Sequence, residues 1–290
     1  MNFIVIVVAL LLDQVIRWFE HARLHRWYER PLADWAAQVH DAPAAVQFLA
    51  AVLPSFILAF AIGAIAWGLS SASTLLGFIW AVIVLVLSLG PRNLGLEISA
   101  YLKARAAGDE KGARRSAGLL LQADPPAVPM DCARAVSEAS LLRAGDWLFS
   151  VLFWFALLGP LGAVLFRMAD TFSVRAAADQ PGSAYARSAE ALKRVLAWVP
   201  MHLLVLTYAL AGGMDETLAE MRRTWRNATT HFLEWGDAAV ISTGRAVVRG
   251  IVAGGSDEVE LLHTTVNVIW RGLIIWLAVI GVITLLGWLF

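Results

Sequence analysis

The sequence has few charged residues and a single cysteine, and both scarcities narrow the class of protein. Only 16% of its 290 residues are charged, whereas soluble domains carry about 25%. Cys132 has no second cysteine to pair with, which excludes a scaffold held by internal disulfides. Basic and acidic residues number 23 each, so the chain has no basic footprint for nucleic acid. The composition also excludes a disordered chain and an ordinary cytosolic enzyme.

Familiar catalytic and metal-binding motifs are missing as well. The chain has no P-loop, no G-x-S-x-G elbow, no H-E-x-x-H pair and no C-x-x-C pair. His21 and His25 lie one helical turn apart beside Glu20, a spacing that can hold a metal ion. The arginines around them favour the alternative, a helix at the membrane interface with basic and aromatic anchors.

Long apolar runs are what the chain has instead. Hydrophobic residues make up 59% of it and 13 residues are tryptophan, a residue that suits membrane interfaces. A helix needs about 20 residues to cross a bilayer. We therefore expect an all-α, polytopic bundle of membrane helices in a single membrane domain, 1–290. Four segments are predicted at 46–69, 74–90, 147–166 and 269–290, the third interrupted by Gly159-Pro160, and two short or broken ones at 3–19 and 195–211.

The two short or broken segments, 3–19 and 195–211, leave the topology of the termini open. Segment 3–19 reaches Asp13 after a short apolar run, and Pro200 and His202 interrupt segment 195–211. Each either spans the membrane or enters it partially, shielded by protein. In both cases the positive-inside rule places the connection from Arg92 to Arg143 in the cytoplasm. We expect a cytoplasmic helical insertion at 91–145 and an amphipathic region at 214–250.

A set of polar residues flanks the predicted segment 147–166. Glu138 and Asp146 are eight residues apart, which places them on nearly one face of a continuous helix. They are candidate metal ligands in a cytoplasmic pocket suited to a metal–phosphate group. Asp170 follows the segment and is expected near the opposite membrane face. The alternative is a set of interfacial charges that anchor the helix. The candidate ligand-binding residues are Arg134, Glu138, Arg143, Asp146, Asp170 and His202.

Three further residues are candidates for polarity at membrane depth, where ionisable groups normally turn inward and pair. They are Asp13, His202 and Arg271. A contact between Asp13 and Arg271 would satisfy both charges. If these residues lie near the ends of spans, they reach the headgroup level instead and need no such partner.

An ordered series of blocks resembles the AmpE family, inner-membrane proteins associated with β-lactamase induction in Gram-negative bacteria. That family is related to the CobD/CbiB membrane enzymes of cobalamin biosynthesis, which join an aminoalcohol or its phosphate to a corrinoid side chain. The resemblance covers nearly the whole chain. Its blocks include Val136-Ser137-Glu138-Ala139-Ser140, Leu152-Phe153-Trp154-Phe155, Gly159-Pro160-Leu161-Gly162-Ala163, Leu165-Phe166-Arg167-Met168-Ala169-Asp170 and Val195-Leu196-Ala197-Trp198-Val199-Pro200.

Departures from the corrinoid pattern favour the AmpE branch. The corrinoid enzymes carry two adjacent acids where this chain has Lys193 and Arg194. Of their Asn-Thr-x-Asp motif only Asp170 is kept, and Asp146 is also retained. By family analogy the corrinoid branch implies Mg and a nucleotide or phosphate, and two bases in place of two acids would remove such a site.

The resemblance therefore implies a multi-pass inner-membrane modulator that links cell-wall stress to β-lactamase induction and has a cytoplasmic protein partner. The alternative is a membrane enzyme related to the CobD/CbiB ligase, with Glu138 and Asp146 binding metal or acting as base. A transporter is a third hypothesis, although no inverted repeats are visible. The partners expected in every case include the lipid bilayer and exclude nucleic acid.

Overall fold

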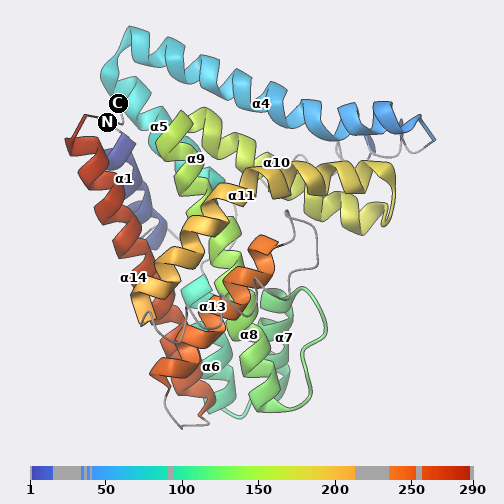
Figure 1. Ribbon diagram of the computed structural model, residues 1–290, viewed down its shortest axis with the longest axis vertical. Helices are drawn as coiled ribbons and strands as arrows, with labels where there is room; N and C mark the ends of the chain where they lie inside the picture. The colour runs from blue at the N-terminus through green and yellow to red at the C-terminus, as the bar shows by residue number, and fades with distance from the viewer. Residues whose placement is uncertain are drawn as a thin grey trace. The chain divides into compact units, whose positions relative to one another are not determined.

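The computed structural model describes residues 2–15, 34–35, 38–39, 41–90, 94–212, 235–252 and 257–287. Every regular element in these ranges is a helix (Figure 1), which confirms the predicted all-α class. Four of these helices are long and apolar enough to cross a membrane. They are α4 (Ala44–Ala72), the continuous helix Pro129–Leu158, α11 (Ala184–Gly212) and α14 (Glu258–Leu285).

Two apolar helices are shorter than a straight crossing requires. The predicted segment 74–90 forms α5 (Thr74–Ser88), which has 15 residues, and α1 (Asn2–Val15) has 14. At 1.5 Å per residue, such helices cover only about 20 Å of the roughly 30 Å hydrocarbon core. The interrupted segment 195–211, in contrast, lies in a helix that continues through Pro200 and is long enough to span.

The prediction of one span at 147–166 is wrong, because the helix ends in the middle of that range. Gly159 adopts φ +63°, and Pro160 occupies the first turn of α10 (Pro160–Asp179). Positive φ is readily available only to glycine, and a first-turn proline suits a helix start. The apolar helix that reaches Leu158 begins at Pro129 instead, inside the predicted insertion 91–145.

The chain divides into two compact units, each described by itself. The first comprises Met1–Pro91, Asp146–Trp198 and Leu277–Phe290, and the second Arg92–Gly145 and Val199–Trp276. In the first unit α10 packs against α4, α5 and α9 (Ser150–Leu158), and α1 packs against α5 and α9. The second unit contains α6 (Leu94–Ala106), α7 (Glu110–Leu121), α8 (Pro129–Ala144) and α13 (Trp235–Ile251).

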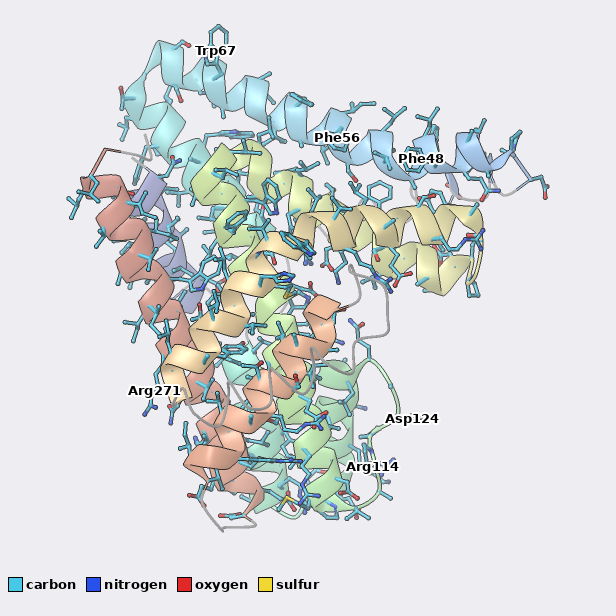
Figure 2. All side chains as sticks on the ribbon, viewed as in Figure 1. Phe48, Phe56, Trp67, Arg114, Asp124 and Arg271 are labelled. Carbon is cyan, nitrogen blue, oxygen red and sulfur yellow. The ribbon has the colours of Figure 1, made fainter. Side chains whose placement is uncertain are left out.

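Helix α4 presents large apolar side chains outward, as a lipid-facing helix does. Ile57, Phe60 and Trp67 are exposed, and only 22% of the most apolar window of α4 is buried. Figure 2 shows Phe48, Phe56 and Trp67 along this helix. The residues that α4 buries are mostly small, which lets α10 approach closely. Bilayer lipid is the environment that accommodates such a surface.

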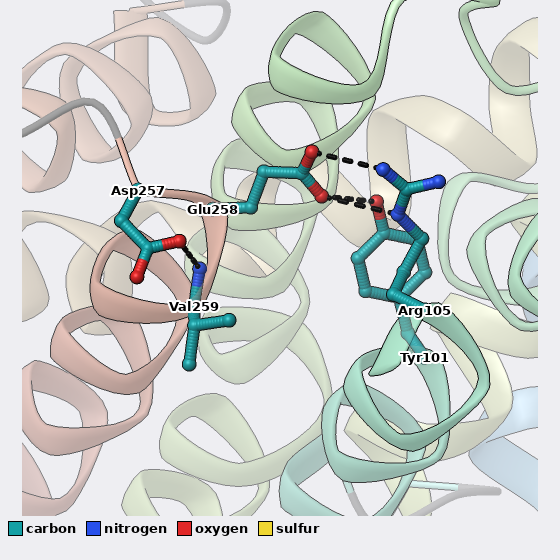
Figure 3. A network of polar contacts seen from close by, with 5 residues as sticks. All are labelled: Tyr101, Arg105, Asp257, Glu258 and Val259. Atoms are coloured by element: carbon teal, nitrogen blue, oxygen red, sulfur yellow. Dashed lines mark hydrogen bonds and ion pairs between the residues drawn. The ribbon is translucent and has the colours of Figure 1, made fainter. Parts of the chain in front are cut away.

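A compact apolar core holds the second unit together. Helices α6, α7, α8 and α14 contribute to it, and its fully buried members include Ile98, Leu120 and Val136. At its edge the guanidinium of Arg105 donates to both carboxylate oxygens of Glu258, over 3.2 and 3.1 Å. The Tyr101 hydroxyl approaches the same carboxylate at 3.5 Å (Figure 3). This bidentate ion pair joins α6 to the start of α14.

Some sequence predictions lie outside the described residues. Glu20, His21 and His25 are among them, so the histidine pair has no structural account. Only residues 235–250 of the predicted amphipathic region 214–250 are described, as the greater part of α13.

Candidate functional site

Asp146 lies in a local irregularity of a long helix. The segment Gly145–Phe149 forms a single π-helical turn, η1, between α8 and α9. Such turns insert an extra residue into an α-helix and occur frequently at functional sites. The backbone amide of Gly90 donates to the carbonyl of Trp147 over 2.9 Å. The segment that follows α5 thereby contacts the π-helical turn.

The sharp turn at Gly159 brings α10 back against α9. A side chain at Gly162 would place its Cβ only 2.1 Å from the carbonyl oxygen of Trp154. Glycine is therefore needed at this position for the two helices to approach. The indole of Trp154 also donates to the carbonyl of Leu196 over 2.9 Å, which attaches α9 to α11. The block around Gly159-Pro160 thus positions three helices of the first unit.

Four charged side chains meet where these helices converge, and we call them the Lys193 cluster: Asp146, Arg167, Asp170 and Lys193. The ammonium of Lys193 lies 2.8 Å from Oδ2 of Asp146 and 3.0 Å from Oδ1 of Asp170. Arg167 donates to Oδ2 of Asp170 over 2.9 Å. The two cations and two anions balance, and all four side chains are at least four-fifths buried. Charges removed from water persist only when paired in this way.

The prediction that Asp146 and Asp170 lie near opposite membrane faces is wrong. It counted 147–166 as one span despite the Gly159-Pro160 interruption, whereas the break at Gly159 returns the chain so that both carboxylates reach Lys193. Sequence reasoning did not include Lys193 among the site candidates. The sequence did contain a signal for it. Lys193 stands where the corrinoid enzymes have an acid, while Asp146 and Asp170 are retained, and a lysine can pair with such carboxylates.

A cavity of about 140 Å³ lies in the second unit and contains two of the predicted residues. Glu138 pairs with the guanidinium of Arg245 across it, with 2.8 Å between Oε1 and Nε. Arg134, also at its wall, approaches Asp131 at 3.4 Å. The lining residues are Met130, Arg134, Ser137, Glu138, Arg245, Val248, Arg249, Val252, Asp257 and Leu261.

The remaining candidates lie elsewhere. Arg143 on α8 and His202 on α11 are partly buried and do not line the cavity. Asp146 does not line it either, and it contacts Lys193 rather than Arg245. The structure therefore brings Arg134 together with Glu138, and Asp146 together with Asp170. Arg271, a candidate for intramembrane pairing, donates to the carbonyl of Ala211 over 3.3 Å.

The described residues do not fit a resident divalent cation. Nowhere in that part of the chain do three His, Cys, Asp or Glu side chains converge as a metal site requires. Between Asp146 and Asp170, where a cation would bridge two carboxylates, the ammonium of Lys193 already supplies the positive charge. Glu138 likewise has Arg245 as its cation.

Comparison with known proteins gives a consistent result. The model of the CobD/CbiB protein family matches residues 6–240. The cobalamin biosynthesis protein CobD of Chromobacterium violaceum is 30% identical over 266 residues, covering 86% of this chain and 80% of that protein. The cobalamin biosynthesis protein CobD of Stutzerimonas stutzeri is 27% identical over 264 residues, covering 83% and 80%. No solved structure matches at a significant level.

Proposed function

The chain belongs to the CobD/CbiB family, and from that premise we propose that it is a membrane enzyme of cobalamin biosynthesis. Its reaction would join the amine of an aminoalcohol, or of an aminoalcohol phosphate, to a side-chain carboxylate of a corrinoid as an amide. The observation that carries the proposal is the family match over residues 6–240, which includes both Glu138 and the whole Lys193 cluster.

The expectation of an AmpE-type modulator of β-lactamase induction is wrong. The matching family model and both relatives are CobD proteins. The expectation rested on the replacement of two acids by Lys193 and Arg194. That replacement is a local change in a chain whose overall similarity lies with the corrinoid branch.

The Lys193 cluster supports a role in binding the polar part of the substrate. A lysine ammonium has three protons to donate, and Asp146 and Asp170 accept two of them. The third proton is available to a carboxylate of the corrinoid. A buried, charge-balanced cluster beside a π-helical turn is costly to maintain in apolar surroundings, and such clusters mark functional sites.

A nucleotide to activate the carboxylate is implied by family analogy alone. The described residues do not fit a resident metal ion, so no step of the proposal passes through one. In this chain the ammonium of Lys193 pairs with the two retained acids, Asp146 and Asp170.

Complementation tests the proposed activity directly. A strain that lacks its own CobD relative is supplied with this chain and grown where cobalamin must be synthesised. We expect growth, and a corrinoid whose mass is the sum of the precursor and the aminoalcohol, or its phosphate, minus one water. If the protein is abundant in the membrane but no such product forms, the proposal is rejected.

Variants of Lys193 connect the activity to the cluster. Lys193→Arg keeps the charge and should retain part of the activity, whereas Lys193→Met should lose it. Lys111→Met, at an exposed position on α7, is the matched control and should behave as wild type. Protein abundance in the membrane is measured for each variant. Equal product from Lys193→Met and wild type would separate the activity from this cluster.

We also propose that the bilayer is the bacterial inner membrane, with α7 on the cytoplasmic side. The orientation follows from the excess of basic residues in the 92–143 region. Cysteine introduced at Arg114, which lies exposed on α7 (Figure 2), provides a test in a Cys132→Ala background. An impermeant thiol reagent should label it only after the cells are opened. Labelling in intact spheroplasts would reverse the orientation.

A further inference from the structure

The cavity of the second unit is formed by residues that do not belong to the Lys193 cluster, and arginines outnumber acids in its lining. Arg134, Arg245 and Arg249 line it together with two acids, Glu138 and Asp257. Arg134 also has Asp131 at 3.4 Å on the same helix, so the charges around the cavity balance, and Arg245 and Arg249 are the arginines left for a ligand. Both α8 and α13 contribute guanidinium groups, and these two helices pack against each other.

The two acids are less available to these arginines than their number implies. Oδ1 of Asp257 accepts from the backbone amide of Val259 over 3.2 Å, at the start of α14 (Figure 3). Glu138 and Arg245 form an ion pair, but their side chains are 31% and 41% exposed and Nε lacks the alignment of a hydrogen bond. A loose, partly solvated pair of this kind is easily rearranged.

Arg249 has fewer side-chain contacts than Arg134 or Arg245. It is exposed, and its side chain forms no hydrogen bond or ion pair within the described part of the chain. A guanidinium group has five N–H donors arranged to bind carboxylate or phosphate oxygens in pairs. Arg245 also keeps donors beyond the one that faces Glu138. The cavity therefore offers more guanidinium donors than Glu138 and Asp257 engage.

Apart from Ser137, the rest of the wall is apolar. Val248, Val252, Leu261 and Met130 line it beside the charged groups. The volume of about 140 Å³ corresponds to roughly four to five water molecules at about 30 Å³ each. That space fits an anionic head and a chain of a few carbons.

We propose that this cavity binds a small organic oxyanion, with Arg249 and Arg245 on its carboxylate or phosphate head and the apolar wall on its short tail. Such an anion has two sources, a soluble metabolite or the phosphate of a membrane lipid. The proposal assigns a binding site and no reaction, and the aminoalcohol phosphate of the proposed corrinoid reaction belongs to the same class of anion. Its test contains no corrinoid, so its failure would leave the proposed activity untouched.

Titration calorimetry on the full chain in non-ionic detergent provides the test, with propyl phosphate, butyrate and inorganic phosphate as probes. We expect propyl phosphate or butyrate to bind, and propyl phosphate to bind more tightly than inorganic phosphate because of the apolar wall. Arg249→Ala should weaken binding about tenfold or more, since it removes charge-assisted hydrogen bonds. Arg115→Ala, which removes an equal charge from an exposed position on α7 outside the cavity, should leave affinity within about twofold.

A second variant tests the apolar wall. Val252→Phe adds bulk inside the cavity and should abolish the preference for propyl phosphate over inorganic phosphate. A parallel titration with phosphatidic acid in nanodiscs decides the source: tighter binding than propyl phosphate identifies a lipid, and weaker binding a soluble anion. Absence of binding by both organic probes, or equal affinity in Arg249→Ala and wild type, would overturn the proposal.

Discussion

Oδ2 of Asp146 accepts a hydrogen bond of 2.8 Å from the ammonium of Lys193, although 47 residues separate the two along the chain. The same ammonium lies 3.0 Å from Asp170. One lysine therefore holds two carboxylates from two other helical segments, η1 and α10. The ammonium of Lys193 thus supplies the positive charge between these two carboxylates.

Removing that cation should destabilise the protein. Lys193→Met removes the ammonium that lies within 3.0 Å of both buried carboxylates. We expect the free energy of unfolding to fall by about 3–5 kcal/mol, the usual cost of breaking a buried ion pair from one side. Tryptophan fluorescence during denaturation in detergent measures it. Lys111→Met on the exposed face of α7 should change stability by less than about 0.5 kcal/mol, and equal stability of the two variants would contradict the prediction.

The close approach of α9 and α10 depends on Gly162. In Gly162→Ala the new Cβ would lie 2.1 Å from the carbonyl oxygen of Trp154, so the backbone must move. We expect a loss of about 1–3 kcal/mol, typical of overpacking, seen as a lower melting temperature. Gly68→Ala is the control, because a Cβ there meets no atom within 4 Å. Should both variants melt at the wild-type temperature, the tight packing at Gly162 would be refuted.

The ion pair between Arg105 and Glu258 should be measurably coupled. Both side chains are less than one-third exposed, and the contact has two hydrogen bonds. A double-mutant cycle with Arg105→Gln and Glu258→Gln should give a coupling free energy of about 1–2 kcal/mol. The pair Arg134 and Asp131 is the comparison, since both are more than half exposed and their coupling should be about 0–1 kcal/mol. A cycle in which the Arg105 pair couples no more strongly would disprove the expectation.

Tyr101 makes stability depend on alkaline pH. Burial raises the pKa of its hydroxyl above the ordinary value, assisted by a hydrogen bond with Cys132. The unfolded chain therefore ionises at about pH 10 while the folded chain does not. Stability is complete below that pH and is lost as the pH rises further, because proton release favours unfolding. Tyr101→Phe should show a smaller loss between about pH 9 and pH 11, measured as denaturation midpoints. Parallel pH profiles for the variant and the wild type would count against it.

Patterns along the sequence predicted the helical class, because apolar run length alone separates membrane helices from other structure. They also selected Glu138, Asp146 and Asp170 as polar residues of interest. The prediction of a single span across 147–166 was wrong because φ at Gly159 is a local conformational choice that an average of hydropathy does not record. The pairing of Glu138 and Asp146 on one face assumed α-helical geometry through Gly145, where the structure has a π turn.

The sequence by itself determined that the chain is apolar, has balanced charge and folds in a lipid bilayer. It also showed that Asp146 and Asp170 are retained and that two bases stand in place of two acids. Only the tertiary structure decided which charges meet. Asp146 with Lys193, and Glu138 with Arg245, are contacts between helices distant in sequence. Which charges pair depends on where each helix turns and how it packs. A buried charge is stable only when packing brings an opposite charge close to it.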